Sequence, residues 1–306
     1  MIKLYNEYSE YLKLKYGEKV YKLPVNLPCT CPNRDGTLGY GGCTFCADVG
    51  TGFEMLDSSL SVREQLKKNM EYISKKYKAD KFIAYFQNYT NTYMDTKIFK
   101  NYINDAIIDN IVEISISTRP DCISDDKLKF LDEIKNTYNV NITIELGLQT
   151  VNYHTLKSIN RGHTLAEFID AVLRIKRYNF EICTHIILNL PGDTIFDTVE
   201  TAKILSALKI DQVKIHSLYI MENTEMGRLY KNNEIIIISK DEYVERVVVF
   251  LEYLNKDIVV QRLAGRAPKE NSLFVNWGMS WWRLKDEILY KMESENRYQG
   301  KKSKFN

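Results

Sequence analysis

Seven short hydrophobic runs, rich in β-branched residues, recur along the chain and are separated by longer polar segments. Runs of this length and composition are typical of strands that are buried in a sheet. The predicted strands occupy residues 20–26, 81–86, 111–117, 141–148, 182–188, 212–218 and 257–263.

Between these runs lie segments in which hydrophobic residues recur with the spacing of a helix. Asp125 and Thr164 stand at the start of two of them and are expected to act as N-terminal caps. The predicted helices cover residues 61–77, 125–138, 165–179 and 196–209.

Alternating strands and helices imply parallel strands joined by crossover helices, because parallel neighbours need a long connection. The number of units fits an open doubly wound sheet or a barrel-like (β/α) fold. In both folds the functional residues lie at the carboxyl ends of the strands.

The segments that follow the predicted strands are rich in Asn, Thr, Gln, Gly and Arg. Each of them alone is typical of an ordinary turn, but their succession at one rim predicts an active site there. They read QNYTNT (87–92), TRPD (118–121), GLQT (147–150), NRGHT (160–164), NLPGDT (189–194) and YIMENT (219–224).

The composition, with 44% hydrophobic and 27% charged residues among 306, is that of a globular protein. The formal net charge of +2 gives no strong overall attraction to nucleic acid. No run approaches the roughly 18 apolar residues that span a bilayer, and the start of the chain lacks a secretory signal. We therefore expect a cytoplasmic protein without a membrane partner. Its main domain would cover residues 1–235, and a helix-strand-helix extension, 236–306, would pack on it.

Four of the six cysteines lie close together, at Cys29, Cys31, Cys43 and Cys46. In a reducing compartment such a cluster indicates metal ligands before disulfides. All four could hold a structural zinc ion, although the interval from Cys31 to Cys43 is short for a zinc ribbon. Alternatively, Cys31, Cys43 and Cys46 could ligate three irons of a 4Fe–4S cluster and leave the fourth iron open to a small molecule. Cys29 would then be a buried thiol beside the cluster.

The chain resembles the radical S-adenosylmethionine (radical SAM) superfamily over nearly its whole length, and most closely the YhcC-like branch. It is more distantly similar to the Elongator catalytic subunit and to oxygen-independent coproporphyrinogen oxidase. The superfamily's common ligand spacing is Cys-x3-Cys-x2-Cys, and the longer first interval here matches the YhcC-like branch. The motifs that carry the resemblance are LPCTCPNRDGTLGYGGCTFC, AYFQNYTNTY, ISISTRPDCI, ELGLQTVNYHTLKSINRGHT, HIILNLPGDT, VKIHSLYI and VVQRLAGRAP.

The resemblance implies an α/β fold, a partial (β/α)6 TIM-like barrel. It also implies that the three-cysteine cluster binds S-adenosylmethionine (SAM) through its amino and carboxylate groups. One electron, from a reductant of the flavodoxin or ferredoxin type, then cleaves SAM to methionine and a 5′-deoxyadenosyl radical. The radical abstracts hydrogen from an unknown substrate. The alternative function is a zinc-stabilised binding protein without catalysis, which a colourless protein with one zinc would support.

Several SAM contacts follow from the resemblance, position by position. Phe45 stands where relatives place an aromatic residue near the adenine. Gln87, Thr90 and Asn91 replace a glycine-rich motif that receives the methionine amino group. Ser117 stands where relatives often carry an acidic ribose-binding residue.

The later strands carry the other implied contacts. Gln149 and Arg161 align with polar SAM contacts, and Arg161 suits the methionine carboxylate. His185 stands in place of a ribose-binding aspartate, and Ile187 in place of an apolar residue that packs on the adenine.

No catalytic acid, base or radical relay can be named from the sequence, and the residues at the rim with suitable chemistry are Tyr89, Tyr93, Tyr219 and Cys122. Cys122 and Cys183 are isolated, so no second cluster is expected.

The C-terminal segment 281–305 mixes aromatic residues with cations and acidic residues. Rings and cations suit single-stranded RNA, and the similarity to Elongator points to tRNA as a possible substrate beside a small metabolite. An amphipathic helix with a solvated basic tail explains the same pattern. The cations are Arg283, Arg297, Lys301, Lys302 and Lys304.

Overall fold

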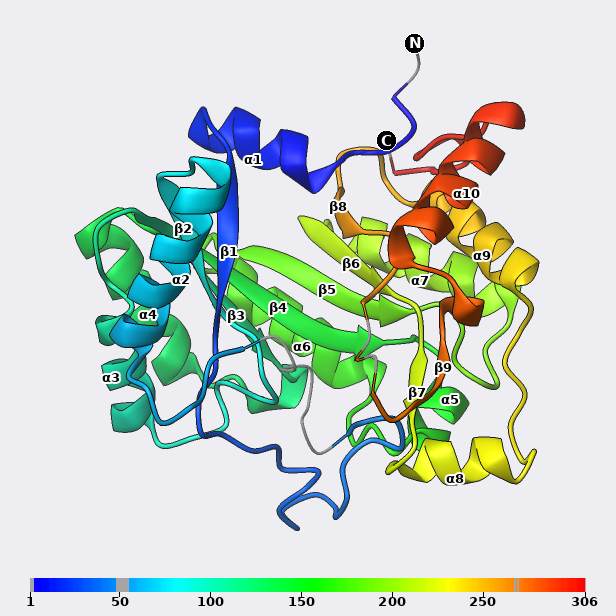
Figure 1. Cartoon of the computed structure of the whole chain (residues 1–306), viewed down its shortest axis with the longest axis horizontal. Coiled ribbons are helices and arrows are strands. Elements are labelled where there is room, and N and C mark those ends of the chain that lie inside the picture. The colour runs from blue at the N-terminus through cyan, green and yellow to red at the C-terminus, as the bar shows by residue number, and fades with distance from the viewer. Residues whose placement is uncertain (1–2, 48–54, 267, 269, 306) are drawn as a thin grey trace.

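A curved sheet of seven parallel strands forms the centre of the computed structural model (Figure 1), which describes residues 3–47, 55–266, 268 and 270–305. The order β1-β2-β3-β4-β5-β6-β8 follows the chain, and every pairing is parallel. Each of the seven predicted strands is present. Their bounds are β1 Val20–Val25, β2 Lys81–Phe86, β3 Ile111–Thr118, β4 Asn141–Gln149, β5 Glu181–Ile187, β6 Gln212–His216 and β8 Val259–Arg262.

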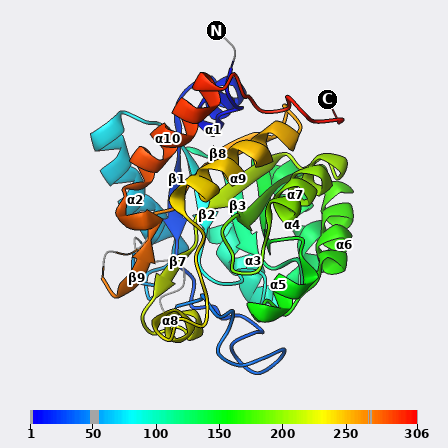
Figure 2. The ribbon, with the colours of Figure 1, turned by 90° about the vertical axis from the view of Figure 1, so that its right-hand side faces the viewer.

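Helices connect the strands and cover the convex face of the sheet (Figures 1 and 2). Four of them, α2, α4, α6 and α7, are those that the spacing predicts. The α-helices are α1 Tyr8–Tyr16, α2 Val62–Tyr77, α3 Thr96–Asp105, α4 Asp125–Tyr138, α5 Tyr153–Ser158, α6 Leu165–Lys176, α7 Ile195–Ala207, α8 Glu225–Lys231, α9 Lys240–Tyr253 and α10 Trp281–Ser294. Two short 3-10 turns are η1 Pro120–Cys122 and η2 Asn276–Gly278.

The two predicted helix caps differ in outcome. Thr164 caps α6 as expected, since its side chain accepts a hydrogen bond from the backbone of Ala166 and Glu167 completes a capping box. The prediction for Asp125 is wrong, because Ser124 occupies the N-cap position and Asp125 is the first residue of α4. An acidic residue in the first turn of a helix is favourable through the helix dipole. Asp125 is therefore typical of a helix start, although the cap itself lies one residue earlier.

The two faces of the sheet differ in polarity. Along β4 the side chains of Ile142, Ile144, Leu146 and Leu148 belong to the main hydrophobic core. Glu145, which alternates with them, hydrogen-bonds to residues of other strands on the opposite face. The helices therefore seal an apolar outer face, and the concave inner face is polar.

The sheet is open between its edge strands β1 and β8, as expected for a partial barrel. Helix α1 lies across the amino ends of the strands and contacts both edges (Figure 1). Just before it, Glu7 forms an isolated parallel bridge with Val260, whose N–H donates to the carbonyl of Asn6 at 2.8 Å. The start of the chain thus closes one end of the half-barrel, and the carboxyl end stays accessible.

The region after residue 235 is continuous with the half-barrel. Strand β8 extends the large sheet beyond β6, and β9 (Ser272–Val275) pairs with β7 (Tyr219–Met221) in a separate two-stranded antiparallel sheet. Helices α9 and α10 pack side by side (Figure 2). A domain boundary at residue 235 stays a prediction. Within the described part of the chain, no helix has the length and apolar character needed to cross a membrane.

Three of the five C-terminal cations take part in contacts within the chain. Arg297 forms ion pairs with Glu245 and Glu252, and Lys302 also pairs with Glu252 at 2.8 Å. Lys301 donates to a backbone carbonyl at residue 296. RNA binding by this segment stays a prediction, and its test is whether any binding weakens steeply with salt.

Candidate active site

A cavity of about 300 Å³ lies at the carboxyl ends of the strands, between the cysteine loop and the inner face of the sheet. Cys31, Cys43 and Cys46 line it together with the ends of the large sheet's strands. This is the rim at which the sequence predicts functional residues, so the cavity is the candidate active site.

The cysteine loop is clamped to the segment that follows α5. Within the loop, the N–H of Gly42 donates to the carbonyl of Asn33 at 2.8 Å. Across to the other segment, Asn160 Nδ2 donates to the carbonyl of Gly42 at 2.9 Å and Thr44 N–H to that of Ile159 at 3.0 Å. Gly42 has φ of 81°, a left-handed conformation in which glycine is favoured. These bonds hold the three thiols over the cavity.

Hydrogen-bond donors surround two of the thiols. Arg161 Nη1 lies 3.5 Å from Cys43 Sγ, and Asn33 Nδ2 lies 3.9 Å from the same sulfur. Arg34 Nη1 lies 3.6 Å from Cys46 Sγ. Burial raises the pKa of Cys46 to about 11, and Cys43 adds to this effect. A metal would supply the positive charge that turns such buried thiols into thiolates, and the donors would then stabilise the sulfurs.

The spacing of the thiols argues against a single zinc ion. Zinc ligands at about 2.3 Å in a tetrahedron bring their sulfurs under roughly 4 Å apart. Among the described residues, the only three His, Cys, Asp or Glu ligand atoms within 4.8 Å of one another belong to Glu145, Cys183 and His185. The sulfurs of Cys31, Cys43 and Cys46 therefore do not converge at single-ion distances. A larger cluster, in which each sulfur binds a different iron, does not require the sulfurs to converge in this way.

Cys29 lies outside the cavity lining. Its thiol faces the carbonyl of Asn88 at 3.5 Å and Asn91 Oδ1 at 3.8 Å, and it packs against the main core. Burial raises the pKa of Cys29 to about 11. This position suits the buried thiol of the sequence prediction better than a fourth metal ligand.

Three of the residues implied for the methionine and ribose ends, Gln87, Thr90 and Ser117, line the cavity. Asn91 is absent from the lining and fully buried. Its side-chain nitrogen donates to the carbonyls of Phe86 at 3.1 Å and Ser117 at 2.9 Å, so it ties the end of β2 to β3. Asn91 therefore holds the loop after β2 in place. Its predicted contact with SAM stays a prediction, since its side chain does not line the cavity.

Arg161 is buried between the cysteine loop and the end of β4. Its Nη2 donates to the carbonyl of Gly147 at 2.8 Å, and its Nε is buried without a hydrogen-bond partner. A Cβ on Gly147 would lie 2.6 Å from that Nη2, so any other residue here would displace the guanidinium from this position. Gln149, which also lines the cavity, has φ of 75° at an irregularity in the pairing of β4. Backbone strain of this kind is common at functional sites.

Arg119 of the TRPD motif supports the same loop. It forms a buried ion pair with Asp121 and donates from Nη1 to the carbonyl of Arg161 at 2.7 Å. The sequence analysis singles out the motif but gives no role to Arg119. The structure makes it the side chain that positions the backbone of Arg161.

A smaller cavity of about 110 Å³ adjoins the first and brings together the residues implied for the adenosine. Phe45, His185 and Ile187 all line it, with Gln149 and Tyr219. Phe45 and Ile187 also pack in one hydrophobic cluster. An aromatic ring, an aliphatic side chain and polar groups around one space suit a nucleoside.

The rim candidates divide between two places. Tyr89 and Tyr219 line the main cavity. Tyr93 and Cys122 line a separate depression beside α4. The structure therefore leaves the two tyrosines of the cavity as the rim candidates near the proposed chemistry.

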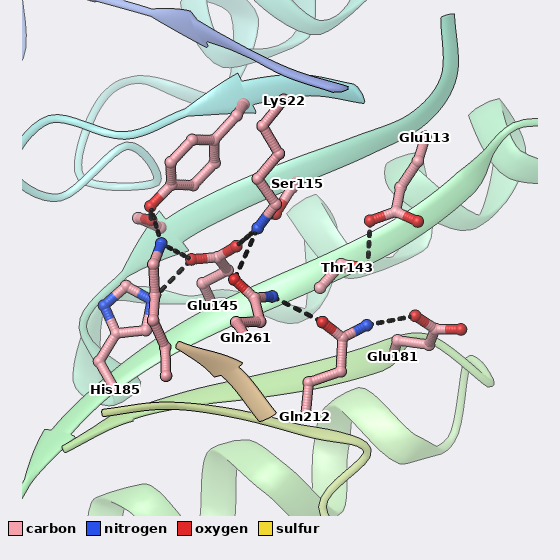
Figure 3. Close-up of polar contacts among 12 residues, drawn as sticks. Lys22, Glu113, Ser115, Thr143, Glu145, Glu181, His185, Gln212 and Gln261 are labelled. Carbon is pink, nitrogen blue, oxygen red and sulfur yellow. Dashed lines mark hydrogen bonds and ion pairs between the residues drawn. The ribbon is translucent and has the colours of Figure 1, made fainter. Parts of the chain in front are cut away.

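A buried polar network that was not predicted from the sequence lies on the inner face of the sheet (Figure 3). Its centre is Glu145, whose two oxygens accept hydrogen bonds from Lys22, Ser115, Lys214 and His185. Lys214 Nζ also donates to the hydroxyl of Tyr85 at 2.8 Å, and Lys22 Nζ to Gln261 Oε1 at 2.9 Å. The sequence feature that indicates this network is the strict alternation of polar and apolar residues within the strands, as in EISIS, TIELG and QVKIH.

The charged groups of this network shift one another's pKa values. Burial alone would raise the pKa of Glu145, but Lys214 and Lys22 outweigh burial and hold that pKa well below its usual value. Burial and Lys214 lower the pKa of His185 to about 4, although Glu145 opposes them. Glu145 is therefore ionised and His185 neutral near neutral pH. The lysine ammonium groups at Glu145 also make the Glu145–Cys183–His185 group a poor cation site.

The chain was compared with known proteins. The Radical SAM superfamily model matches residues 29–205, and the Radical_SAM C-terminal domain model matches residues 210–294. The uncharacterized protein YtqA of Bacillus subtilis is 34% identical over 98% of this chain and 92% of its own length. The protein YhcC of Escherichia coli is 30% identical over 92% of this chain and 89% of its own length.

Among solved structures, the archaeal Elp3 of Methanocaldococcus infernus with an N-terminal deletion superposes with a TM-score of 0.70. It is 18% identical, and the alignment covers 92% of this chain and 64% of that one. At this identity the likeness concerns the fold, and it covers most of the chain.

Proposed function

The chain belongs to the radical SAM superfamily, in the YhcC-like branch, and on that premise we propose that it is an enzyme that holds a 4Fe–4S cluster on Cys31, Cys43 and Cys46 and binds SAM beside it. When bound, these groups supply the one-electron cleavage that yields a 5′-deoxyadenosyl radical for hydrogen abstraction. The electron comes from a small donor of the flavodoxin or ferredoxin type.

The observation that carries the proposal is the convergence of the three cysteines on the cavity that receives the carboxyl ends of the strands. Arg34, Asn33 and Arg161 donate toward their sulfurs and would stabilise the thiolates of a cluster. In this arrangement Cys29 is a bystander.

The other residues of the two cavities suit the parts of SAM. Arg161, with a buried Nε that lacks a partner, would pair with the methionine carboxylate. Gln87 and Thr90, in the loop that follows β2, would hydrogen-bond to the methionine amino group of SAM. Ser117, on β3, lines the same cavity. Phe45 and Ile187 would enclose the adenine, and neutral His185 would hydrogen-bond to the ribose. The side chains thereby orient the cofactor and exclude water from it.

Anaerobic purification tests this function directly. We expect a brown protein with about four irons per chain that releases methionine and 5′-deoxyadenosine from SAM when a reductant is added. Cys43→Ser should lose both the iron and the cleavage. Cys29→Ser is the matched control and should keep both. A colourless wild-type protein with one zinc, or equal loss in the two variants, would refute the proposal.

A further inference from the structure

The floor of the main cavity carries more positive than negative charge. Lys214 and Arg262 are cross-strand partners on β6 and β8, and both line the cavity. Glu145 is the carboxylate that shares this floor, and its side chain is fully buried. Lys22, on β1, also points at Glu145.

Glu145 cannot neutralise all these cations. It already pairs with Lys22 and Lys214 and accepts from Ser115 and His185, which occupies both of its oxygens. Arg262 forms no ion pair among the described residues. One buried carboxylate therefore faces two ammonium groups and a guanidinium.

Arg262 keeps donors available. Its Nη2 contacts the ring nitrogens of His216, and its Nε is buried without a hydrogen-bond partner. Burial first, and then Arg262, hold the pKa of His216 well below its usual value, so this histidine is a neutral neighbour and no counter-charge. A guanidinium with free donors matches the oxygens of a carboxylate or a phosphate.

The proposed cofactors would not remove this excess. A 4Fe–4S cluster held by three thiolates carries a net negative charge in its oxidised form, and SAM bound through its amino nitrogen and its carboxylate is neutral overall, because the sulfonium balances the carboxylate. The charge of the cluster lies at the thiols, next to Arg34 and Arg161, so the cations of the floor keep their excess, and an uncompensated buried cation is costly. The positive charge that remains at the floor of the cavity would be balanced by an anionic group of a further ligand.

We propose that the substrate carries an anionic oxygen group, a carboxylate or a phosphate, that binds between Arg262 and Lys214 at the floor of the cavity. This inference rests on the proposed function, because it takes the same cavity as the place where the substrate is held. The hydroxyl of Tyr85, which accepts from Lys214, lies at the same floor. Glu145 and Tyr85 then hold Lys214 in place for the anion.

The test is calorimetric titration of the anaerobically reconstituted protein, saturated with SAM, with inorganic phosphate and separately with succinate. We expect saturable binding of at least one probe, and the tighter probe identifies the chemical class. Arg262→Gln should weaken that binding at least about tenfold, as expected for the loss of hydrogen bonds to a charged group. Arg283→Gln, which removes an exposed arginine on α10, should leave it unchanged.

Several results would overturn the inference. They are no binding of either probe to the wild type, equal binding by Arg262→Gln, and binding that occurs only when SAM is left out. If Arg262→Gln does not melt cooperatively, Lys214→Gln replaces it with the same expected loss. Iron content and SAM cleavage are measured on the same samples. Anion binding without cleavage would refute the proposed function alone, and cleavage without anion binding would refute this inference alone.

Discussion

Along β4, residues that face the helices alternate with residues that face the cavity, and the two sets differ in kind. Ile142, Ile144 and Leu146 pack into a continuous apolar core. Glu145, between two of them, is equally buried, and its carboxylate is stable there because lysine, serine and histidine side chains donate hydrogen bonds to it. One face is stable through apolar area alone, and the other depends on a balance of charges.

The outer face of the sheet supplies most of the stability, and the inner face supplies the polar groups of the cavity. Apolar side chains on the outer face tolerate many substitutions of similar volume. The inner face has no such freedom, because each polar group relies on a specific partner. We therefore expect substitutions on the two faces to fail in different ways.

The largest effect is expected for Glu145→Gln. The amide keeps the shape of the side chain but leaves Lys22 and Lys214 buried without their counter-charge, which should lower the free energy of unfolding by about 3–5 kcal/mol. Urea unfolding of the purified protein measures it. Adding Lys214→Met to the same chain should recover part of the loss, since one of the two cations is then gone. A loss under about 1 kcal/mol would show that solvent already screens the inner face.

Leu146→Ala, one residue further along β4, addresses the outer face. Leu146 is fully buried against the helices, and its truncation should cost about 3 kcal/mol through lost apolar contact and the cavity left behind. In contrast to the variants at Lys214 and Arg262, it should leave SAM and anion binding unchanged in the folded protein. A change in those affinities at equal folded fraction would show that the two faces are coupled.

A smaller effect concerns the pH dependence of stability. Burial lowers the pKa of His185 to about 4, below its unfolded value near 6.5, so the unfolded state takes up the proton first as the pH falls. The contribution of His185 is fully present above pH 6.5 and is lost as the pH falls toward 4. Between about pH 7 and pH 5 the loss should be about 2 kcal/mol.

His185→Gln should remove this part of the pH dependence, as measured by urea unfolding at several pH values. Burial also lowers the pKa of His163, to about 3, so a residual slope should remain. His154→Gln, at an exposed position on α5, is the control and should keep the wild-type slope. Equal slopes in wild type and His185→Gln would contradict the assignment.

The outer face of the sheet could be predicted from the sequence, because hydrophobic periodicity reports which residues leave water. It located all seven strands of the large sheet and four of the helices. The cluster of four cysteines is visible in the sequence, and the resemblance to the radical SAM superfamily selects the three of them that line the cavity. These features depend on short stretches of chain, in which local pattern is sufficient.

The inner polar layer could not be predicted in the same way. Alternation along a strand says that one face is polar, but it does not say whether that face meets water or the interior of a barrel. Glu145, Lys214 and Arg262 lie on three different strands, and only the pairing order and curvature of the sheet bring them together. The position of Asn91 beneath the cavity and of α1 across its far end also depends on tertiary packing.

Next to the bridge between Glu7 and Val260, two segments that are far apart in the sequence meet. Asn6 donates its N–H to the side chain of Gln299, and Gln299 N–H donates to the carbonyl of Leu4 at 2.9 Å. On the ribosome, the cysteine loop emerges before β8 and Gln299. The nascent chain therefore presents Cys31, Cys43 and Cys46 before the strand that carries Arg262 can complete the wall of the cavity.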